Sequence, residues 1–392
     1  MLLSRSFLKS AIFYVVILAL AMLFIIFGNR MARADTVIFG QSSQSEIVSA
    51  KVELILQHEN DPFELAGKIY ENKVIYFEAT VQGGPRSGER IIARQIIDSM
   101  WTIPLQEISL GDRVVLIYTS YGADNTMSWI MQEYDRTRTL IGVGLFFSVL
   151  LLLFGRRKGV GTLVSLALTC LCIFLVFVPA IISGYNIYMC TFVVCAYTVV
   201  LTLLLVNGPN FKSLSAGVGT FGGIASSGLL FLFFNSFLKL TGMIDEDMAF
   251  LMNVNTESPI DLKALIFASV LIGILGAALD VGVSIASALA EIQQVNPGAT
   301  TKDLIQSGFN VGRDVLGTMS NTLILVFIGS SLPSTLLLVV YSNSLLELIN
   351  RESIAVEILQ SIIGCIGLLC TIPLTAFFYA FVSTKRRKND FD

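Results

Sequence analysis

The sequence predicts a polytopic α-helical membrane protein with about eight transmembrane helices and a small all-β domain after the first helix. Three observations predict this class. Only 14% of the 392 residues are charged and 54% are hydrophobic, whereas a soluble chain keeps about 25% charged residues. Several uncharged runs approach the ~20 residues that a helix needs to cross a bilayer. One hydrophilic stretch of domain size, 29–136, alternates apolar and polar residues as strands do.

The first apolar run covers 11–28 and follows two basic residues, Arg5 and Lys9. Residues 32–34 (Ala-Arg-Ala) have the small-x-small spacing of a signal-peptide cleavage site. The run is, however, longer than the ~7–15-residue apolar core of a signal peptide. We therefore expect 1–28 to be a retained transmembrane anchor, with a cleaved signal peptide as the alternative.

The stretch 29–136 is expected to form the β-rich domain. Val52, Leu54 and Leu56 alternate with polar neighbours, the pattern of a half-buried strand. Three similar runs follow and are separated by glycine-containing turns: runs 73–81, 89–97 and 113–120, and turns 83–88 and 111–112. A barrel or a sandwich fits this pattern, and an OB-like barrel is one option. Periodicity alone does not choose between them.

Residues 137–384 are expected to form a helical membrane domain of about seven further spans. The apolar runs are 140–154, 160–183, 187–206, 214–238, 264–290, 315–332 and 354–382. Basic residues in short loops mark the cytoplasmic side. They occur at 156–158 and in the tail 385–392. Both termini are therefore expected in the cytoplasm, and 29–136 is expected to be extracytoplasmic.

The run 334–350 is apolar enough to be a ninth span, but a ninth span would place the basic tail outside. We interpret the run as a re-entrant or interfacial element on the outer side. Ser342, Asn343 and Ser344 are expected at its bend.

One apolar helix carries a carboxylate, Asp280, on a stripe of small and polar residues with helical spacing. The stripe comprises Gly273, Gly276, Asp280, Ser284, Ser287 and Glu291. A lipid-facing acid at mid-depth costs at least ~2.5–3.5 kcal/mol. Asp280 should therefore face protein or a water-filled cavity, unless it lies at the cytoplasmic interface.

A second stripe follows on the next span. It comprises Asn310, Asp314, Gly317, Thr318 and Asn321. The two spans meet at a short cytoplasmic loop, so they are expected to be antiparallel neighbours. We hypothesise a polar ion or substrate pathway formed by Asp280, Ser284, Ser287, Asp314, Thr318 and Asn321. Such oxygen ligands suit a small cation or a proton path. Simple interhelical hydrogen bonding is the alternative.

Small residues on three helices predict close helix packing. Gly219 and Gly223 have GxxxG spacing, and Gly273, Gly276 and Gly317 lie on the two polar stripes. Pro179 and Pro373 lie inside spans and are expected to kink them.

Several classes of function are disfavoured. All six cysteines fall in apolar runs, and His58 is the single histidine, so we expect neither a disulfide framework nor a metal site. No Walker loop and no basic nucleic-acid patch is present. A membrane hydrolase using Asp280 and Asp314 as a dyad stays a minor alternative. We expect no enzymatic activity, no catalytic residue and no cofactor.

The segments 276–292 (GAALDVGVSIASALAEI), 296–300 (NPGAT) and 312–333 (GRDVLGTMSNTLILVFIGSSLP) resemble the YibE/F-like family of bacterial multi-pass membrane proteins. The resemblance extends from about residue 138 to the C-terminus. The domain after the first helix resembles the larger of the family's two forms. The resemblance implies residence in the bacterial plasma membrane and a smaller paralogue as a partner. A homo-oligomer is the alternative assembly. The resemblance implies nothing about substrate.

The main functional hypothesis is a transporter or permease-like protein for an ion or small solute. The alternative is a membrane-anchored sensing or assembly protein that binds a partner through its extracytoplasmic β-domain.

Overall fold

The computed structural model describes residues 5–32, 46–65, 68–98, 106–120, 127–252 and 259–389. The chain divides into two compact units. Met1–Thr36 and Leu151–Asp392 form the helical unit, and Val37–Leu150 form the β unit. The second unit ends later than the predicted 29–136 because it includes the beginning of the first helix after the strands.

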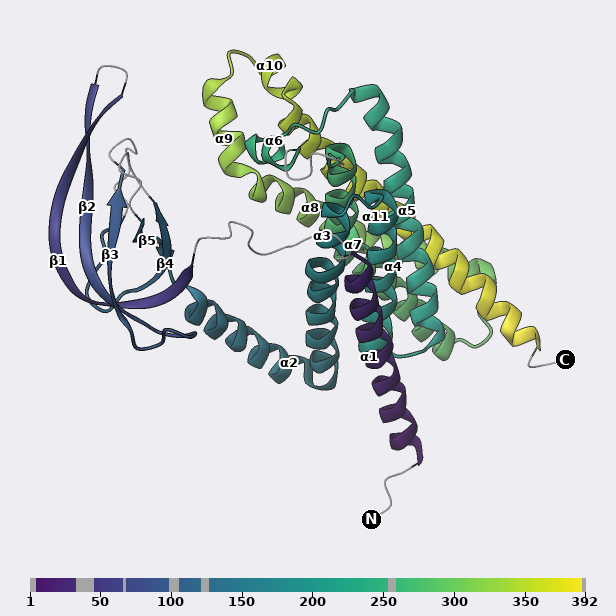
Figure 1. Ribbon diagram of the computed structural model, residues 1–392. Coiled ribbons are helices and arrows are strands. Elements are labelled where there is room, and N and C mark those ends of the chain that lie inside the picture. Colours follow the sequence, from purple (N-terminus) through teal and green to yellow (C-terminus); the bar gives the residue numbers. More distant parts are fainter. Residues whose placement is uncertain are drawn as a thin grey trace. The chain divides into compact units, whose positions relative to one another are not determined.

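Eight described segments are long and apolar enough to cross a membrane, as predicted. The backbone of α2 turns sharply at Arg156 (φ 48°) and so separates two of them. The first is Thr137–Arg156, and the second, Lys158–Ile182, continues from α2 through η1 and α3. The chain is thus a multi-pass membrane protein (Figure 1). Its helices are α1 (Arg5–Ala32), α2 (Thr137–Cys172), η1 (Ile173–Phe177), α3 (Val178–Ile182), α4 (Ile187–Val206), α5 (Phe211–Leu238), α6 (Glu246–Met252), α7 (Leu262–Val295), α8 (Thr301–Ser330), α9 (Leu332–Tyr341), α10 (Leu345–Asn350) and α11 (Glu352–Asn389).

The predicted small all-β domain is present. Its strands are β1 (Ile47–Leu65), β2 (Lys68–Val81), β3 (Arg90–Ile97), β4 (Arg113–Ser120) and β5 (Met127–Tyr134). They pair in the order β1-β2-β3-β5-β4, and β4 pairs back with β1, so the ladder of strands closes on itself. The closure is thinnest between β3 and β5, which pair in parallel over only two residues of each strand. The long β1–β2 hairpin curves strongly (Figure 1).

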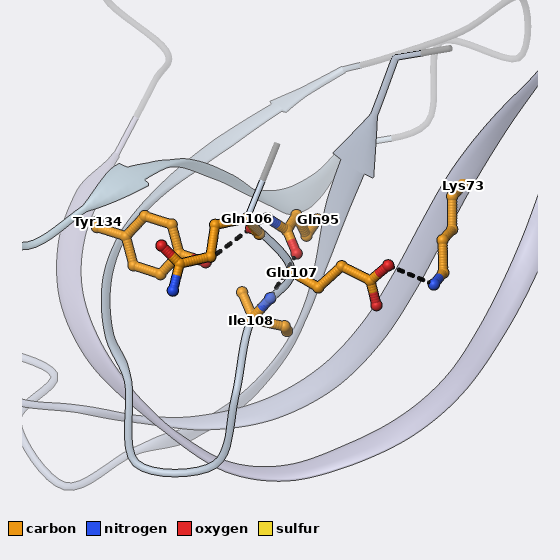
Figure 2. A network of polar contacts seen from close by, with 6 residues as sticks. All are labelled: Lys73, Gln95, Gln106, Glu107, Ile108 and Tyr134. Carbon is orange, nitrogen blue, oxygen red and sulfur yellow. Dashed lines mark hydrogen bonds and ion pairs between the residues drawn. The ribbon is translucent and has the colours of Figure 1, made fainter. Parts of the chain in front are cut away.

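Alternation decides which side chains fill the β unit. Ile75, Phe77 and Leu116 are fully buried, and β3 alternates exposed and buried positions along its first four residues. A polar network ties the segment before β4 to the sheet (Figure 2). The Gln106 carbonyl accepts hydrogen bonds from the Gln95 amide (2.9 Å) and the Tyr134 hydroxyl (2.8 Å). The backbone N–H of Ile108 donates to Gln95 (3.0 Å).

The helical unit has two apolar cores. In the first, α7 packs with α4, α5, α8 and α11, and Phe267, Ile274 and Ile285 are fully buried. The second joins α1 to the later part of α2, η1, α3 and α4. Phe24 of α1 stacks on Tyr197 of α4 with ring centroids 4.8 Å apart. The first helix therefore belongs to the packed unit.

Glycines bring α5 close to α11. A methyl group at Gly219 would overlap Thr375, and one at Gly223 would overlap Thr371. Ser227 on the same face donates to the Ile363 carbonyl of α11 (3.2 Å). Backbones that approach this closely gain packing contacts that lipid cannot supply.

The run 334–350 is broken in the structure. The helix α9 has ten residues and α10 has six, and neither has a buried residue. Between them Ser342 is extended, and Ser344 caps α10 by accepting a hydrogen bond from the Glu347 N–H (3.2 Å). At ~1.5 Å per residue, α9 is about 15 Å long, which is too short for a ~30 Å bilayer core.

The two prolines behave differently. Pro179 lies in the first turn of α3, directly after the π-helical turn η1. Proline has no backbone N–H to donate, and the π-helical turn before it changes the hydrogen-bonding pattern of the helix at this point. Pro373 lies inside α11, which continues on both sides of it.

Candidate functional site

Asp280 lies near the midpoint of α7, eighteen residues after Leu262 and fifteen before Val295. A 34-residue helix is about 51 Å long and exceeds a ~30 Å bilayer core by ~20 Å. When this excess is shared between the two ends, Asp280 lies close to the middle of the core. The length of α7 therefore favours a mid-membrane position over the interface.

The stripe around Asp280 is the exposed face of α7. Gly273, Gly276, Asp280 and Ser284 are exposed, and Ser287 is half-buried. The opposite side is fully buried in the first core, where its residues include Ala278, Val281 and Ile285. The chain thus packs the apolar faces of α7 inside and leaves the polar face outside.

The helix α8 shows the same division. Its stripe residues Asn310, Asp314, Gly317, Thr318 and Asn321 are all exposed. Its buried residues are Leu304, Gly308, Gly312 and Leu323. A methyl group at Gly308 would crowd Ala376, and one at Gly312 would overlap Ile372, so this face packs closely on α11.

The two stripes share one level of the α7–α8 hairpin. A methyl group at Gly273 would lie 3.5 Å from the Phe327 ring, which sets the register of the two helices. Seven residues further along α7 is Asp280, and seven residues back along α8 is Ser320. Thr318 and Asn321 are therefore at the depth of Asp280, as the hypothesis requires.

Hydrogen bonds and ion pairs between the stripes are absent from the described residues. No hydrogen bond or ion pair there involves Asp280, Ser284 or Asn321. The Thr318 hydroxyl donates to the Val315 carbonyl of its own helix (2.9 Å). The structure places Thr318 and Asn321 at the depth of Asp280, and all three are exposed. Ser284 is exposed one turn further along α7, Ser287 is half-buried, and Asp314 lies about 9 Å from that depth. Hydrogen bonds between the two helices do not join these residues in the described part of the chain.

The stripe glycines differ from those of α5. Methyl groups at Gly276 and Gly317 would meet no atom within 4 Å. Within the described chain, these two glycines therefore border open space, whereas Gly219 and Gly223 lie against α11.

Two polar residues of α11 were not predicted, and one of them bonds α7. Gln360, only 8% exposed, donates to the Ser269 hydroxyl (3.2 Å), and Ser269 precedes Gly273 by one turn of α7. Glu357 has a carboxylate oxygen, Oε2, that is buried without a hydrogen-bond partner in the described part of the chain. A signal existed, because Glu357 is the only acid in the run 354–382.

The hydrolase alternative gains no geometric support. Asp314 is six residues from the level of Asp280, about 9 Å along the helix axis, and a dyad needs hydrogen-bonding reach.

The described residues contain no group of three or more His, Cys, Asp or Glu side chains that could hold a metal ion. All six cysteines are free thiols.

A family model described as YibE/F-like protein matches residues 143–385, well over half of the chain. The chain belongs to this family. The match includes both polar stripes together with Glu357 and Gln360 of α11, and it leaves out the strands. Searches of curated proteins and of solved structures each give no match.

Proposed function

We propose that this YibE/F-like protein is a permease-like protein that moves an ion or a small solute along α7 and α8. The observation that supports the proposal is the exposure of Asp280 near the middle of a helix long enough to span a membrane. Lipid against this acid costs at least ~2.5–3.5 kcal/mol. The face must therefore meet water or another protein surface.

The composition of the face suits a small cation or a proton. Asp280 supplies a carboxylate, Ser284 and Thr318 supply hydroxyls, and Asn321 supplies an amide oxygen. Hard cations prefer oxygen ligands of these kinds. The proposal includes no catalytic step and no resident cofactor.

Another subunit completes the path in this proposal. Gly276 and Gly317 border open space on the exposed side, so a second helical surface has room to approach. The proposed partner is a second copy of the chain or a smaller family paralogue. Either would replace lipid by polar groups along the stripes.

The proposed setting is the bacterial plasma membrane, with both termini cytoplasmic and the β unit extracytoplasmic. Basic residues in the short turn at 156–158 and in the tail 385–388 support this orientation. The path would then run from the α8–α9 end outside to the loop 296–300 inside.

A flux screen on proteoliposomes tests the proposal. Wild type and Asp280→Asn are compared on a panel of monovalent and divalent cations, protons and small neutral solutes. We expect one solute class to be transported by wild type and at least tenfold more slowly by the variant. The matched control is Asp247→Asn, the same change in an exposed acid of α6. Equal transport by all three proteins, or none by wild type, would refute the proposal.

An exposed apolar feature of the β unit supports the second candidate, a sensing or assembly protein. Leu54 of β1 and Ile92 of β3 are 49% and 65% exposed. Each is paired with Glu78 of β2, the strand between them. Neighbouring apolar side chains on a solvent-exposed surface suit the binding of a protein partner. This candidate predicts that deleting 40–130 abolishes function in cells whereas Asp280→Asn is tolerated. The permease predicts that Asp280→Asn is not tolerated.

A further inference from the structure

A second feature of the helical unit is a cavity of about 830 Å³ between α4 and α5. Its walls come from 196–204 on α4 and from 211–222 on α5, together with Pro209 and Asn210 of the connecting turn. The lining is mostly apolar. This size lies within the ~300–1,000 Å³ typical of small-molecule sites.

The cavity opens on the surface that faces the membrane. Val200 and Leu214 line it and are 56% and 54% exposed. Both belong to helices long enough to span a bilayer. Because acyl chains surround such a surface, the molecule with the most direct access to the cavity is a membrane lipid.

One end of the cavity is polar. Ser213 lines it, is only 5% exposed, and has a hydroxyl with no hydrogen-bond partner among the described residues. A buried hydroxyl left unpaired costs ~1–3 kcal/mol. A ligand that hydrogen-bonds Ser213 would remove this cost.

The same end holds the N-terminus of α5. Its N-cap residue, Asn210, makes no side-chain cap: its amide donates instead to the Asn207 carbonyl (2.8 Å). Lys212 follows in the first turn. An uncapped helix N-terminus with a lysine beside it favours an anionic group, phosphate in particular.

We propose that this cavity binds one anionic glycerophospholipid taken from the membrane. The acyl chains lie along the apolar walls at Val199, Val200 and Phe221, and the phosphate lies at the first turn of α5 beside Ser213 and Lys212. The turn 207–210 is on the proposed cytoplasmic side, where anionic lipid attracts basic residues. The inference does not depend on the transport proposal.

Native mass spectrometry of the full chain in detergent tests this site. The protein is titrated with phosphatidylglycerol and with phosphatidylcholine of the same acyl chains. We expect one phosphatidylglycerol to be retained in preference to phosphatidylcholine. Lys212→Gln should weaken its binding about fivefold, the effect of one lysine near an anionic lipid surface. Ser213→Ala should weaken it further in combination.

Two kinds of control keep the test sharp. Ser226→Ala removes a hydroxyl of the same helix that bonds its own turn, and Lys239→Gln removes the lysine after its other end; both should bind lipid as wild type does. Gly217→Trp should fill the cavity and abolish retention. Inorganic phosphate should not compete, because it has no acyl chains.

Equal retention of the two lipids, or no loss in the Lys212→Gln, Ser213→Ala double variant, would overturn the proposal. A dimer that Gly217→Trp dissociates, in a protein that retains no lipid, would also overturn it. That result would assign the cavity to a second copy of the chain.

Discussion

The β unit and the helical unit place polar groups by opposite rules. In the β unit the interior is mostly apolar, and ion pairs such as Lys73–Glu107 (2.6 Å) and Arg90–Glu78 (3.5 Å) lie on the surface. In the helical unit the surface itself is apolar, and Leu229 and Phe237 are about two-thirds exposed or more (70% and 67%). The difference teaches that water surrounds one unit and lipid surrounds the other. The exposed polar faces of α7 and α8 differ from the rest of this apolar surface. For this reason we propose a function for them.

The largest expected effect concerns the close packing of α5 on α11. In a membrane such packing, and not the hydrophobic effect, holds helices together. Gly219→Val and Gly223→Val should each lower the stability of the helical unit by about 3 kcal/mol or more, because the new side chain overlaps α11. Thermal unfolding in detergent measures the loss. Gly276→Val is the matched control, since it meets open space. An equal loss in the control would show that packing does not distinguish the two glycine sets.

A smaller effect is expected at a polar clamp outside the apolar core. The Glu352 carboxylate accepts hydrogen bonds from the Thr241 N–H and hydroxyl (both 2.7 Å) and the Gly242 N–H (2.6 Å). Glu352→Ala should cost about 1–3 kcal/mol, since it leaves these donors unpaired. Thermal unfolding and limited proteolysis near 239–245 report the loss. Glu352→Gln should lose less, and identical behaviour of the two variants would argue against the clamp.

The β unit should be sensitive to a buried polar group and insensitive to an exposed one. Gln95 is 5% exposed and bonds the backbone of Gln106 and Ile108. Gln95→Ala should cost about 1–3 kcal/mol and speed hydrogen exchange in 106–109. Lys73→Gln, which breaks only the exposed pair with Glu107, should change neither quantity. A larger effect at Lys73 would reverse the expected ranking.

The smallest expected effect is a shift in acid stability. The Ser49 hydroxyl donates to Asp135 (2.6 Å) and, with Thr137, lowers the pKa of that carboxyl. A lowered pKa gives stability that is present above the ordinary aspartate value and is lost as the pH falls through the folded value. Ser49→Ala should therefore be less stable than wild type at about pH 7, and the difference should shrink as the pH falls below the ordinary pKa of aspartate. Carboxyl NMR should show the pKa of Asp135 rising in the variant.

Hydropathy and alternation predicted most of the architecture because they show whether the side chains of each segment face water, lipid or the protein interior. The eight long apolar helices and the small β domain follow from them. The strand β5 was not predicted, and β1 is much longer than the alternation around Val52 indicates. Those elements depend on pairing partners that are remote in sequence, so local pattern carries little of the information.

The two polar stripes, but not their neighbours on α11, were predicted for a similar reason. Helical spacing placed Asp280 and Asn321 on polar stripes, and the hairpin register puts them at one depth. Gln360 was not predicted, because its bond to Ser269 joins residues 91 positions apart.

The sequence by itself determined that lipid surrounds most of this chain and that α7 and α8 each carry one polar face, because composition and helical period are local properties. Only the tertiary structure decided which face of each helix is turned inward. Close packing at Gly219, Gly223, Gly308 and Gly312 draws the apolar faces together, and the polar faces are left on the outside. Whether a helix face is buried depends on the helices that pack against it, and the sequence of one segment does not specify those neighbours.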